Sequence, residues 1–220
     1  GIFDLMTHQH QLLYLEMHNT KNGQHVFQSG TRYDWYILEN KKASKKTDII
    51  DDKYKKISLN LNEWDFLPNN NHELIKKLLK KENEEPVKII KNSKYYTLAK
   101  HTSTKKQGDF KYPLVHSTPK SGVRYYYSNT KDKGHFKIPK IIFGESGISE
   151  VIIDLDGKYG MTESAMAIEV KNESEAKKLK KVLESNEFQD ILNACSWSNF
   201  RIDWRLFAYM KNDFYKYINH

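Results

Sequence analysis

Residues 140–155 read KIIFGESGISEVIIDL, and this stretch decides the fold of the C-terminal half. Two short apolar runs, at 140–143 and 151–155, stand on either side of a segment rich in Gly, Ser and Glu. Runs of this length that end in turn residues are typical of buried β-strands. We therefore expect two sheet strands joined by a loop.

Similar runs lie on both sides of this stretch. Residues 112–115 and 123–127 precede it, and residues 165–170 follow it. Asp156-Gly157 is the sequence signature of a tight hairpin turn. After residue 170 the apolar residues recur with the spacing of a helix. Helices are expected at residues 173–185, 187–194 and 203–218. Strands followed by helices predict an α+β fold, with a twisted mixed or antiparallel sheet and C-terminal helices.

The N-terminal part has a less regular pattern. The spacing of Leu5, Leu12 and Met17 favours a helix over this segment, and Asn22-Gly23 predicts a turn after it. Residues 32–38 are dense in aromatic side chains, which indicates a largely buried strand. Arg32 at its start is expected to be structural, with Asp34 as its partner.

A hairpin and a helix complete this part. Residues 47–50 and 56–61 flank Asp51-Asp52, which predicts a β-hairpin. Residues 72–79 have the spacing of a short amphipathic helix. The next stretch is charged and has few large aliphatic residues. The expected organisation is a smaller hairpin-and-helix segment at 1–80, a connector at 81–111 and a larger domain at 112–220.

Charge and cysteine content limit the function classes. The chain of 220 residues has 36 basic and 28 acidic side chains, a net charge of +8. This excess favours an anionic partner, with nucleic acid before a membrane surface, although solvated lysines alone produce the same charge. Since no apolar run approaches the roughly 20 residues that cross a bilayer, we expect no membrane span. Cys195 is the only cysteine, which excludes an internal disulfide and indicates a reducing, cytoplasmic location.

Most enzyme signatures are missing from the sequence. It has no Gly-x-Gly-x-x-Gly, no Walker A loop and no Gly-x-Ser-x-Gly. His8 and His10 are two residues apart, so on a helix they point to different faces. Because zinc requires three or four convergent ligands, we expect no metal site there.

One pattern is typical of a nuclease. Asp154 and Asp156 lie at a strand end, and the next strand holds Glu169 and Lys171 in a Glu-x-Lys arrangement. This is the layout of PD-(D/E)xK nucleases, in which two carboxylates hold Mg²⁺ and the lysine helps to activate water. A Mg²⁺-dependent DNA endonuclease is therefore the alternative function. A simple turn explains Asp156 equally well.

Basic and aromatic residues alternate between residues 117 and 137. Lys120 and Arg124 lie close to three consecutive tyrosines, and Lys131, Lys133 and His135 follow in the next loop. Flexible loops of this composition can contact phosphates, and an Arg or Asn within them can read base edges. Alternatively, the tyrosines pack the sheet and the lysines are only solvated. For the loops taken together, we favour DNA contact.

Several short segments carry a resemblance to a known family. They are residues 112–118 (YPLVHST), 139–144 (PKIIFG), 159–162 (YGMT), 175–185 and 188 onwards, including Trp197-Ser198-Asn199-Phe200. Together they resemble the target recognition domain of adenine-N6 DNA methyltransferases from restriction–modification systems. Residues 24–38 (QHVFQSGTRYDWYIL) are similar to the final strands of the catalytic domain of these enzymes, so residues 1–80 look like a remnant of that domain.

The resemblance implies a division of labour. This chain would recognise double-stranded DNA by sequence, and a methyltransferase catalytic domain, in cis or as a partner chain, would flip the adenine and bind S-adenosylmethionine. The chain has no Pro-Pro, so it lacks the Asn/Asp-Pro-Pro-Tyr/Phe motif of the catalytic core. We therefore expect no cofactor in this chain and no methyl transfer by it alone. The residues expected to contact DNA are Lys120, Arg124, Lys131, Lys133, His135 and Lys140.

Overall fold

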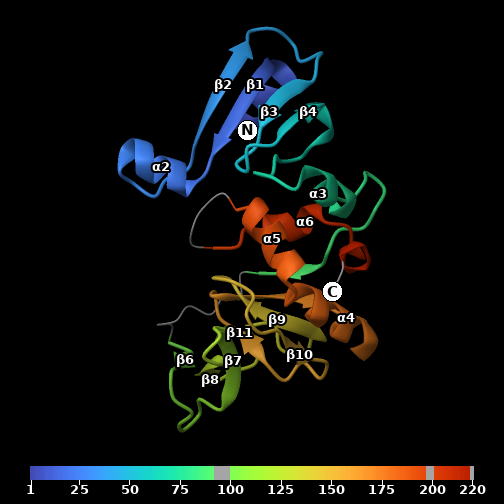
Figure 1. The fold of residues 1–220 in the computed structure, drawn as a ribbon. Helices are drawn as coiled ribbons and strands as arrows, with labels where there is room; N and C mark the ends of the chain where they lie inside the picture. The colour runs from blue at the N-terminus through green and yellow to red at the C-terminus, as the bar shows by residue number, and fades with distance from the viewer. Residues whose placement is uncertain (92–99, 197–200, 219–220) are drawn as a thin grey trace. The chain divides into compact units, whose positions relative to one another are not determined.

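The computed structural model describes residues 1–91, 100–196 and 201–218 (Figure 1). Three four-stranded sheets and several helices make up this part of the chain, which confirms the α+β prediction. The chain divides into two compact units, residues 1–73 and 74–220. No helix within the described residues is both long enough and apolar enough to cross a membrane.

The N-terminal unit is built on one mixed sheet. Its order is β2-β1-β3-β4, with bounds Tyr33–Glu39, Gln11–His18, Thr47–Ile50 and Lys56–Leu59. Helix α1 (Ile2–Asp4) precedes the segment predicted to be a helix, and within that segment only the π-turn η1 (Leu5–Gln9) is helical. The rest of that prediction is wrong, because Leu15 and Met17 alternate with more exposed residues and are buried as strand residues.

Helix α2 (Thr20–Phe27) occupies the position where a turn was predicted. The Asn19 side chain accepts hydrogen bonds from the backbone N–H groups of Lys21 and Asn22, and the Asn22 side chain accepts one from the Asn19 N–H. This reciprocal cap starts a helix. Gly23 is needed for close packing, since a Cβ there would lie 1.9 Å from the Thr31 carbonyl oxygen.

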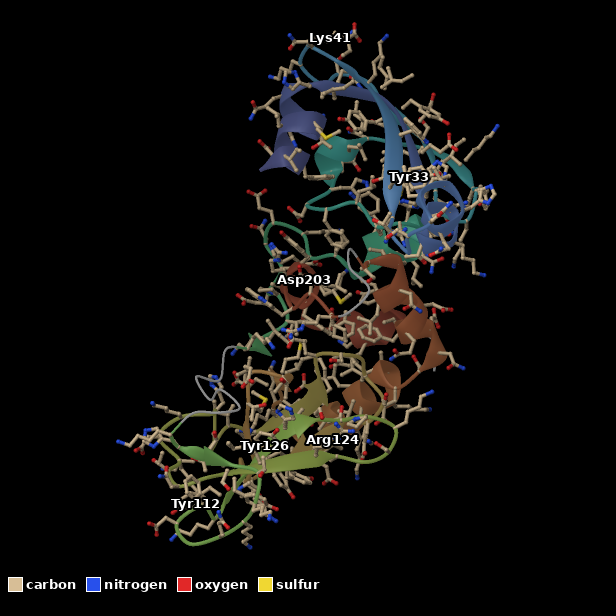
Figure 2. All side chains as sticks on the ribbon, turned by 90° about the vertical axis from the view of Figure 1, so that its left-hand side faces the viewer. Tyr33, Lys41, Tyr112, Arg124, Tyr126 and Asp203 are labelled. Atoms are coloured by element: carbon tan, nitrogen blue, oxygen red, sulfur yellow. The ribbon has the colours of Figure 1, made fainter. Side chains whose placement is uncertain are left out.

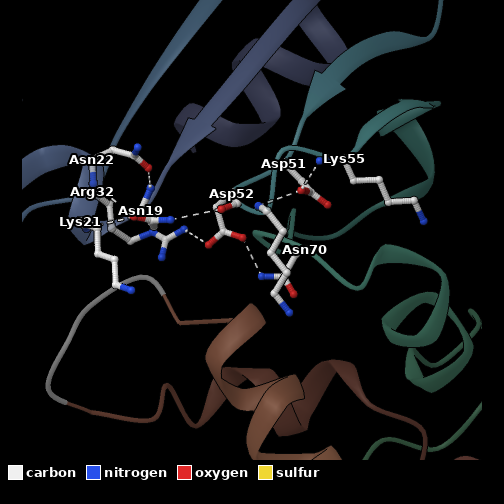
Figure 3. Close-up of polar contacts among 9 residues, drawn as sticks. Asn19, Lys21, Asn22, Arg32, Asp51, Asp52, Lys55 and Asn70 are labelled. Atoms are coloured by element: carbon white, nitrogen blue, oxygen red, sulfur yellow. Dashed lines mark hydrogen bonds and ion pairs between the residues drawn. The ribbon is translucent and has the colours of Figure 1, made fainter.

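The β3–β4 hairpin forms as predicted, and its turn is fixed by two aspartates (Figure 3). Asp51 accepts hydrogen bonds from the backbone N–H groups of Lys53 and Lys55, both at 2.9 Å. The Asp52 carboxylate accepts from Arg32 Nη2 at 2.6 Å and from Asn70 Nδ2 at 2.7 Å. Arg32 therefore has a structural role, as expected. Its ion-pair partner is Asp52 and not the predicted Asp34.

The C-terminal unit contains two sheets. One has the order β10-β9-β12-β5, with bounds Ile152–Asp154, Lys140–Gly144, Ala165–Glu169 and Ile89–Ile90. The other has the order β11-β7-β8-β6, with bounds Gly160–Met161, Tyr112–Ser117, Arg124–Ser128 and Thr102–Ser103. Strands β5 and β6 come from the stretch expected to be a connector. That stretch therefore belongs to the second unit, which begins before residue 112.

The turn at Asp156-Gly157 does not join a hairpin. Strand β10 pairs with β9, whereas β11 crosses to the other sheet and runs parallel to β7. Gly157 has φ of +62°, and a Cβ there would lie 2.4 Å from the Lys137 Cα. The glycine thus permits a sharp change of direction against a neighbouring loop.

Helices precede and follow the two sheets of the C-terminal unit along the chain. They are α3 (His72–Leu78), which confirms the helix predicted at 72–79, α4 (Glu173–Leu183), α5 (Asn186–Ala194), α6 (Arg205–Tyr209) and the 3₁₀ turn η3 (Phe214–Tyr217). Asn172 and Ser185 cap α4 and α5 through side-chain hydrogen bonds. The Phe207 ring of α6 contacts Phe143 of β9 at 5.5 Å and Phe188 of α5 at 6.1 Å between ring centroids, which places α6 against β9. Residues Trp197-Ser198-Asn199-Phe200 lie outside the described residues.

Candidate nucleic-acid interface

The β7–β8 hairpin presents two different faces. Val115 and Tyr125 are paired across the strands and pack against the β9 sheet through Ile142. Leu114 and Tyr126 are the next pair, so their side chains lie on the opposite face. The alternation thus gives one face to the core and leaves the other for a mixture of aromatic and basic side chains.

This second face forms what we call the aromatic–basic strip. Its members are Lys111, Tyr112, Leu114, His116, Arg124, Tyr126, Lys131 and Phe136. Figure 2 shows Tyr126 between Tyr112 and Arg124 along the sheet. Leu114 is buried at the centre of the strip, where Tyr112, Tyr126 and Phe136 pack around it.

His116 and Tyr126 form the middle of the strip. Their rings stack with centroids 4.3 Å apart and planes inclined by 14°. His116 Nδ1 is hydrogen-bonded to Thr162 Oγ1 at 2.9 Å, which fixes the ring orientation. Partial burial lowers the pKa of His116 below its ordinary value, and the positive charge of Arg124 lowers it further, against an opposing effect of Glu163. His116 is therefore largely neutral at pH 7, and Arg124 supplies the positive charge at this end.

Two lysines place positive charge at the other end of the strip. Lys131 Nζ lies 5.0 Å from the centre of the Tyr112 ring and 6.0 Å from that of Phe136. Lys111 Nζ lies 5.5 Å from the Tyr112 ring. At these distances the ring faces attract the ammonium groups. The strip thus has a cation at each end and aromatic rings between them.

The structure brings Arg124 and Lys131 of the predicted DNA contacts together on the strip. Lys120 lies outside it, at the exposed tip of the β7–β8 hairpin, in a turn where the Gly122 N–H donates to the Pro119 carbonyl. Lys133 and His135 lie in the loop between β8 and β9. Lys133 is exposed, whereas His135 is half-buried with φ of +62°.

Lys140 is a correction to the predicted set. Its side chain is 0% exposed, and its Nζ donates to Asp154 Oδ2 at 2.7 Å and to the Ile138 carbonyl at 3.2 Å. Burial lowers the pKa of Lys140, although the hydrogen bond and charge of Asp154 oppose this shift. An ammonium group enclosed in this way is not accessible to a DNA phosphate.

The ion pair with Lys140 also occupies Asp154, one of the carboxylates predicted to bind Mg²⁺ in the nuclease alternative. Besides Lys140, its carboxylate accepts hydrogen bonds from the backbone N–H groups of Lys158 at 2.8 Å and Tyr159 at 3.1 Å. Strand β9 separates Asp154 on β10 from Glu169 on β12. The described residues contain no group of three His, Cys, Asp or Glu side chains placed to hold a metal ion.

The remaining members of that pattern lie on the surface. Asp156 is exposed in the turn that follows β10, and Glu169 is exposed at the end of β12. Lys171 is exposed just before α4, where its backbone N–H donates to Glu175 Oε2 at 2.7 Å. Asp154 thus has a structural role, and the geometry does not converge on a two-carboxylate Mg²⁺ site.

Residues 143–147, which include Gly144 and Gly147, are held by contacts within the fold. The Gly144 N–H donates to Thr118 Oγ1 at 2.9 Å, and the Glu145 N–H donates to the Ser164 carbonyl at 3.0 Å. The Glu145 carboxylate pairs with Lys91 at 3.2 Å. These groups therefore have partners within the fold.

Sequence reasoning did not identify Lys111, Tyr112 and His116 as members of the aromatic–basic strip. The alternation of Tyr112, Leu114 and His116 along one strand was available as a signal. Their convergence with Lys131 depends on the path of the loop after β8, which no local pattern encodes. Comparison of the sequence with models of protein families and with curated proteins gave no match to either.

Proposed function

We propose that the C-terminal unit is a sequence-specific double-stranded DNA recognition module of an adenine-N6 DNA methyltransferase. In this proposal the chain lacks the catalytic core and acts together with a catalytic domain, in cis or as a partner chain, that binds S-adenosylmethionine. The observation that supports DNA contact is the aromatic–basic strip, with cations at both ends. The assignment to a methyltransferase rests on the sequence resemblance.

The dimensions of the strip suit a duplex. The six residues of β7 (Tyr112–Ser117) span roughly 17 Å from first to last, at about 3.3 Å per step. This length corresponds to about five base-pair steps of 3.4 Å each. Arg124 and Lys131, near opposite ends, can therefore contact separate phosphates of one duplex. The tyrosine hydroxyl groups between them are suitable donors to the backbone.

The flanking loops supply the means to read sequence. The β7–β8 tip, with Lys120, and the β8–β9 loop, with Lys133, extend from opposite ends of the hairpin. Both loops combine small polar residues with exposed lysines. Phosphate contacts along the strip would set the register of the duplex, and side chains of the loops would then reach base edges in the grooves.

Fluorescence anisotropy with labelled duplexes, over a series of salt concentrations, tests the DNA contact. Arg124→Glu and Lys131→Glu should each weaken binding at least tenfold and reduce the slope of log K against log salt by about one. Lys178→Glu, an exposed site on α4, is the matched control and should change affinity little. Affinity that is insensitive to salt, or equal losses in all three variants, would contradict the proposal.

Two further measurements separate the parts of the proposal. Selection from randomised duplexes should enrich one sequence if the module is specific. Addition of a polypeptide with an Asn-Pro-Pro-Tyr motif and S-adenosylmethionine should then methylate adenine N6 within that sequence. DNA binding without enrichment would refute specific recognition, and enrichment without methylation would refute the assignment to a methyltransferase.

A further inference from the structure

Strand β2 carries an apolar surface that nothing in its own unit covers. Trp35, Tyr36 and Ile37 are 61%, 56% and 57% exposed, and Leu38 is 38% exposed. A largely buried strand was predicted here, and that prediction is wrong for this chain. Figure 1 shows β2 at the outer edge of the N-terminal sheet, with β1 on its only paired side. The backbone groups on the outer side of β2 therefore have no strand partner within the described residues.

The exposed side chains lie on both faces of the strand. Trp35 and Ile37 are on one face, and Tyr36 and Leu38 are on the other. On the second face, Leu12 and Leu15 of β1 are opposite Leu38 and Tyr36, and both of these β1 residues are buried. The side chains that bury Leu12 and Leu15 on this face of β1 therefore do not extend over Tyr36 and Leu38 of β2. We call the side chains that cover this face of β1 the covering layer.

The apolar surface continues beyond the strand. The Phe27 ring contacts Tyr33 edge-on at 5.0 Å, and Tyr33 contacts Trp35 edge-on at 6.2 Å. Phe27 and its neighbour Val26 are each 52% exposed at the end of α2. The four β2 side chains alone leave roughly 400 Å² uncovered, which is the size of the largest apolar patches on monomeric proteins, and those patches are often binding sites.

The amino-acid pattern of β2 is that of an interior strand. Consecutive apolar residues on both faces are typical of strands in sheets that have helices on each side. A soluble protein normally protects an edge strand with charges, prolines or a bulge. Between Asp34 and Glu39, β2 has four large apolar side chains in succession, with no charged residue or proline among them.

We infer that the outer edge of β2 accepts a strand from a partner polypeptide, and that this partner is an α/β domain whose layers cover both faces of β2. A second copy of this chain fits less well. Pairing of two β2 strands would continue the sheet, but each copy's own covering layer ends before β2, so both faces would remain bare. The inference rests on the proposed function for the identity of the partner, which is the catalytic domain that the proposal requires.

The test uses the full chain and the methyltransferase polypeptide of the same genome that carries the Asn-Pro-Pro-Tyr motif. Tyr36→Lys and Ile37→Lys place a charge on either face of β2, and Ser58→Lys places the same charge on β4, the opposite edge strand. All three side chains are exposed in this chain, so the variants should fold normally by circular dichroism. We expect the two β2 variants to bind the partner at least 100-fold more weakly, with binding of Ser58→Lys unchanged.

Hydrogen exchange locates the contact independently. In the complex, the amides of Tyr33–Glu39 should become protected and those of Lys56–Leu59 should not. Partner binding that survives both β2 substitutions, protection only at other segments, or a genome without such a polypeptide would overturn the inference. Self-association that Ile37→Lys abolishes, in the absence of partner binding, would assign the surface to a second copy.

Duplex binding measured on the same samples separates this inference from the proposed function. A chain that binds duplex DNA through the aromatic–basic strip but does not bind the partner contradicts the inference alone. A chain that binds the partner at β2 but binds no duplex contradicts DNA recognition alone.

Discussion

Removal of the buried ammonium group at Lys140 should destabilise the C-terminal unit strongly and leave its DNA affinity unchanged. At 2.7 Å from Asp154, and with an effective dielectric constant of about 20, the Coulomb attraction is about 6 kcal/mol. Desolvation of both ions offsets most of this gain, so the net value of the pair is small. Lys140→Met removes the attraction but leaves the Asp154 carboxylate buried, and this asymmetry determines the cost.

The magnitude follows from the partners that Asp154 retains. Breaking a buried pair by removing one member typically costs about 3–5 kcal/mol. Because the N–H groups of Lys158 and Tyr159 still donate to the carboxylate, we expect about 3 kcal/mol for Lys140→Met. The double variant Lys140→Met with Asp154→Asn buries no charge, so its cost should be clearly below the sum of the two single costs.

Native-state hydrogen exchange of the β9 amides is the appropriate assay. These residues are buried at the centre of their sheet, so their slowest exchange reports the free energy of unfolding of this unit, separately from the N-terminal unit. Duplex affinity is measured on the same variant under conditions in which it is folded. A loss of stability below about 1 kcal/mol, together with a tenfold loss of DNA affinity, would refute the structural role and restore Lys140 as a DNA contact.

Two further predictions concern single residues. Gly23→Ala should destabilise the N-terminal unit by at least about 2 kcal/mol in urea unfolding, because its Cβ would overlap the Thr31 carbonyl. The control Gly30→Ala, with no atom within 4 Å of its Cβ, should be nearly neutral. Equal effects of the two substitutions would show that the close approach at Gly23 is absent. Burial raises the pKa of Cys195 to about 12, so Ellman's reagent should label it in guanidinium but not in the native protein at pH 8. The folded state holds the thiol proton to a higher pH than the unfolded state does. The resulting contribution to the free energy of unfolding is therefore fully present below the ordinary thiol pKa and is lost progressively as the pH rises towards 12. The Cys195→Ala variant should lack this pH-dependent loss of stability.

The longer strands of the C-terminal unit, β7 to β10 and β12, could be predicted because their runs are continuous and end at turn residues, whereas the two-residue strands β5, β6 and β11 were missed. Residues 141–143 are buried on both faces of β9, so their apolar character alone identifies them as a strand. The segment of β1 was misassigned because its buried residues Leu12, Leu15 and Met17 do not keep a strict period of two. A β-bulge between Leu12 and Tyr14, formed where β1 pairs with β2, shifts the alternation by one residue. Tertiary pairing of this kind leaves no local trace.

The candidate site was only partly predictable for the same reason. Exposed loop residues such as Lys131 could be chosen by composition and charge. Lys140 could not be separated from them, because a lysine at the start of a strand has the same sequence appearance whether it is solvated or paired with a residue 14 positions later. Likewise, the sequence placed Arg32 beside Asp34, but the chain fold brings Asp52 to it from the next hairpin.

Lys140 and β2 break the pattern of apolar interior and polar surface in opposite directions. Lys140 is a charged side chain in the core, and Asp154 and a backbone carbonyl satisfy it within the fold. The apolar side chains of β2 lie on the surface, and nothing in the described residues of their unit satisfies them. A buried charge that has hydrogen-bond partners within the fold needs no external partner. Exposed apolar side chains that nothing in the fold covers indicate a partner outside the chain. By this criterion β2 is the stronger indicator of function, and net charge is the weaker one, since solvent alone satisfies an exposed lysine.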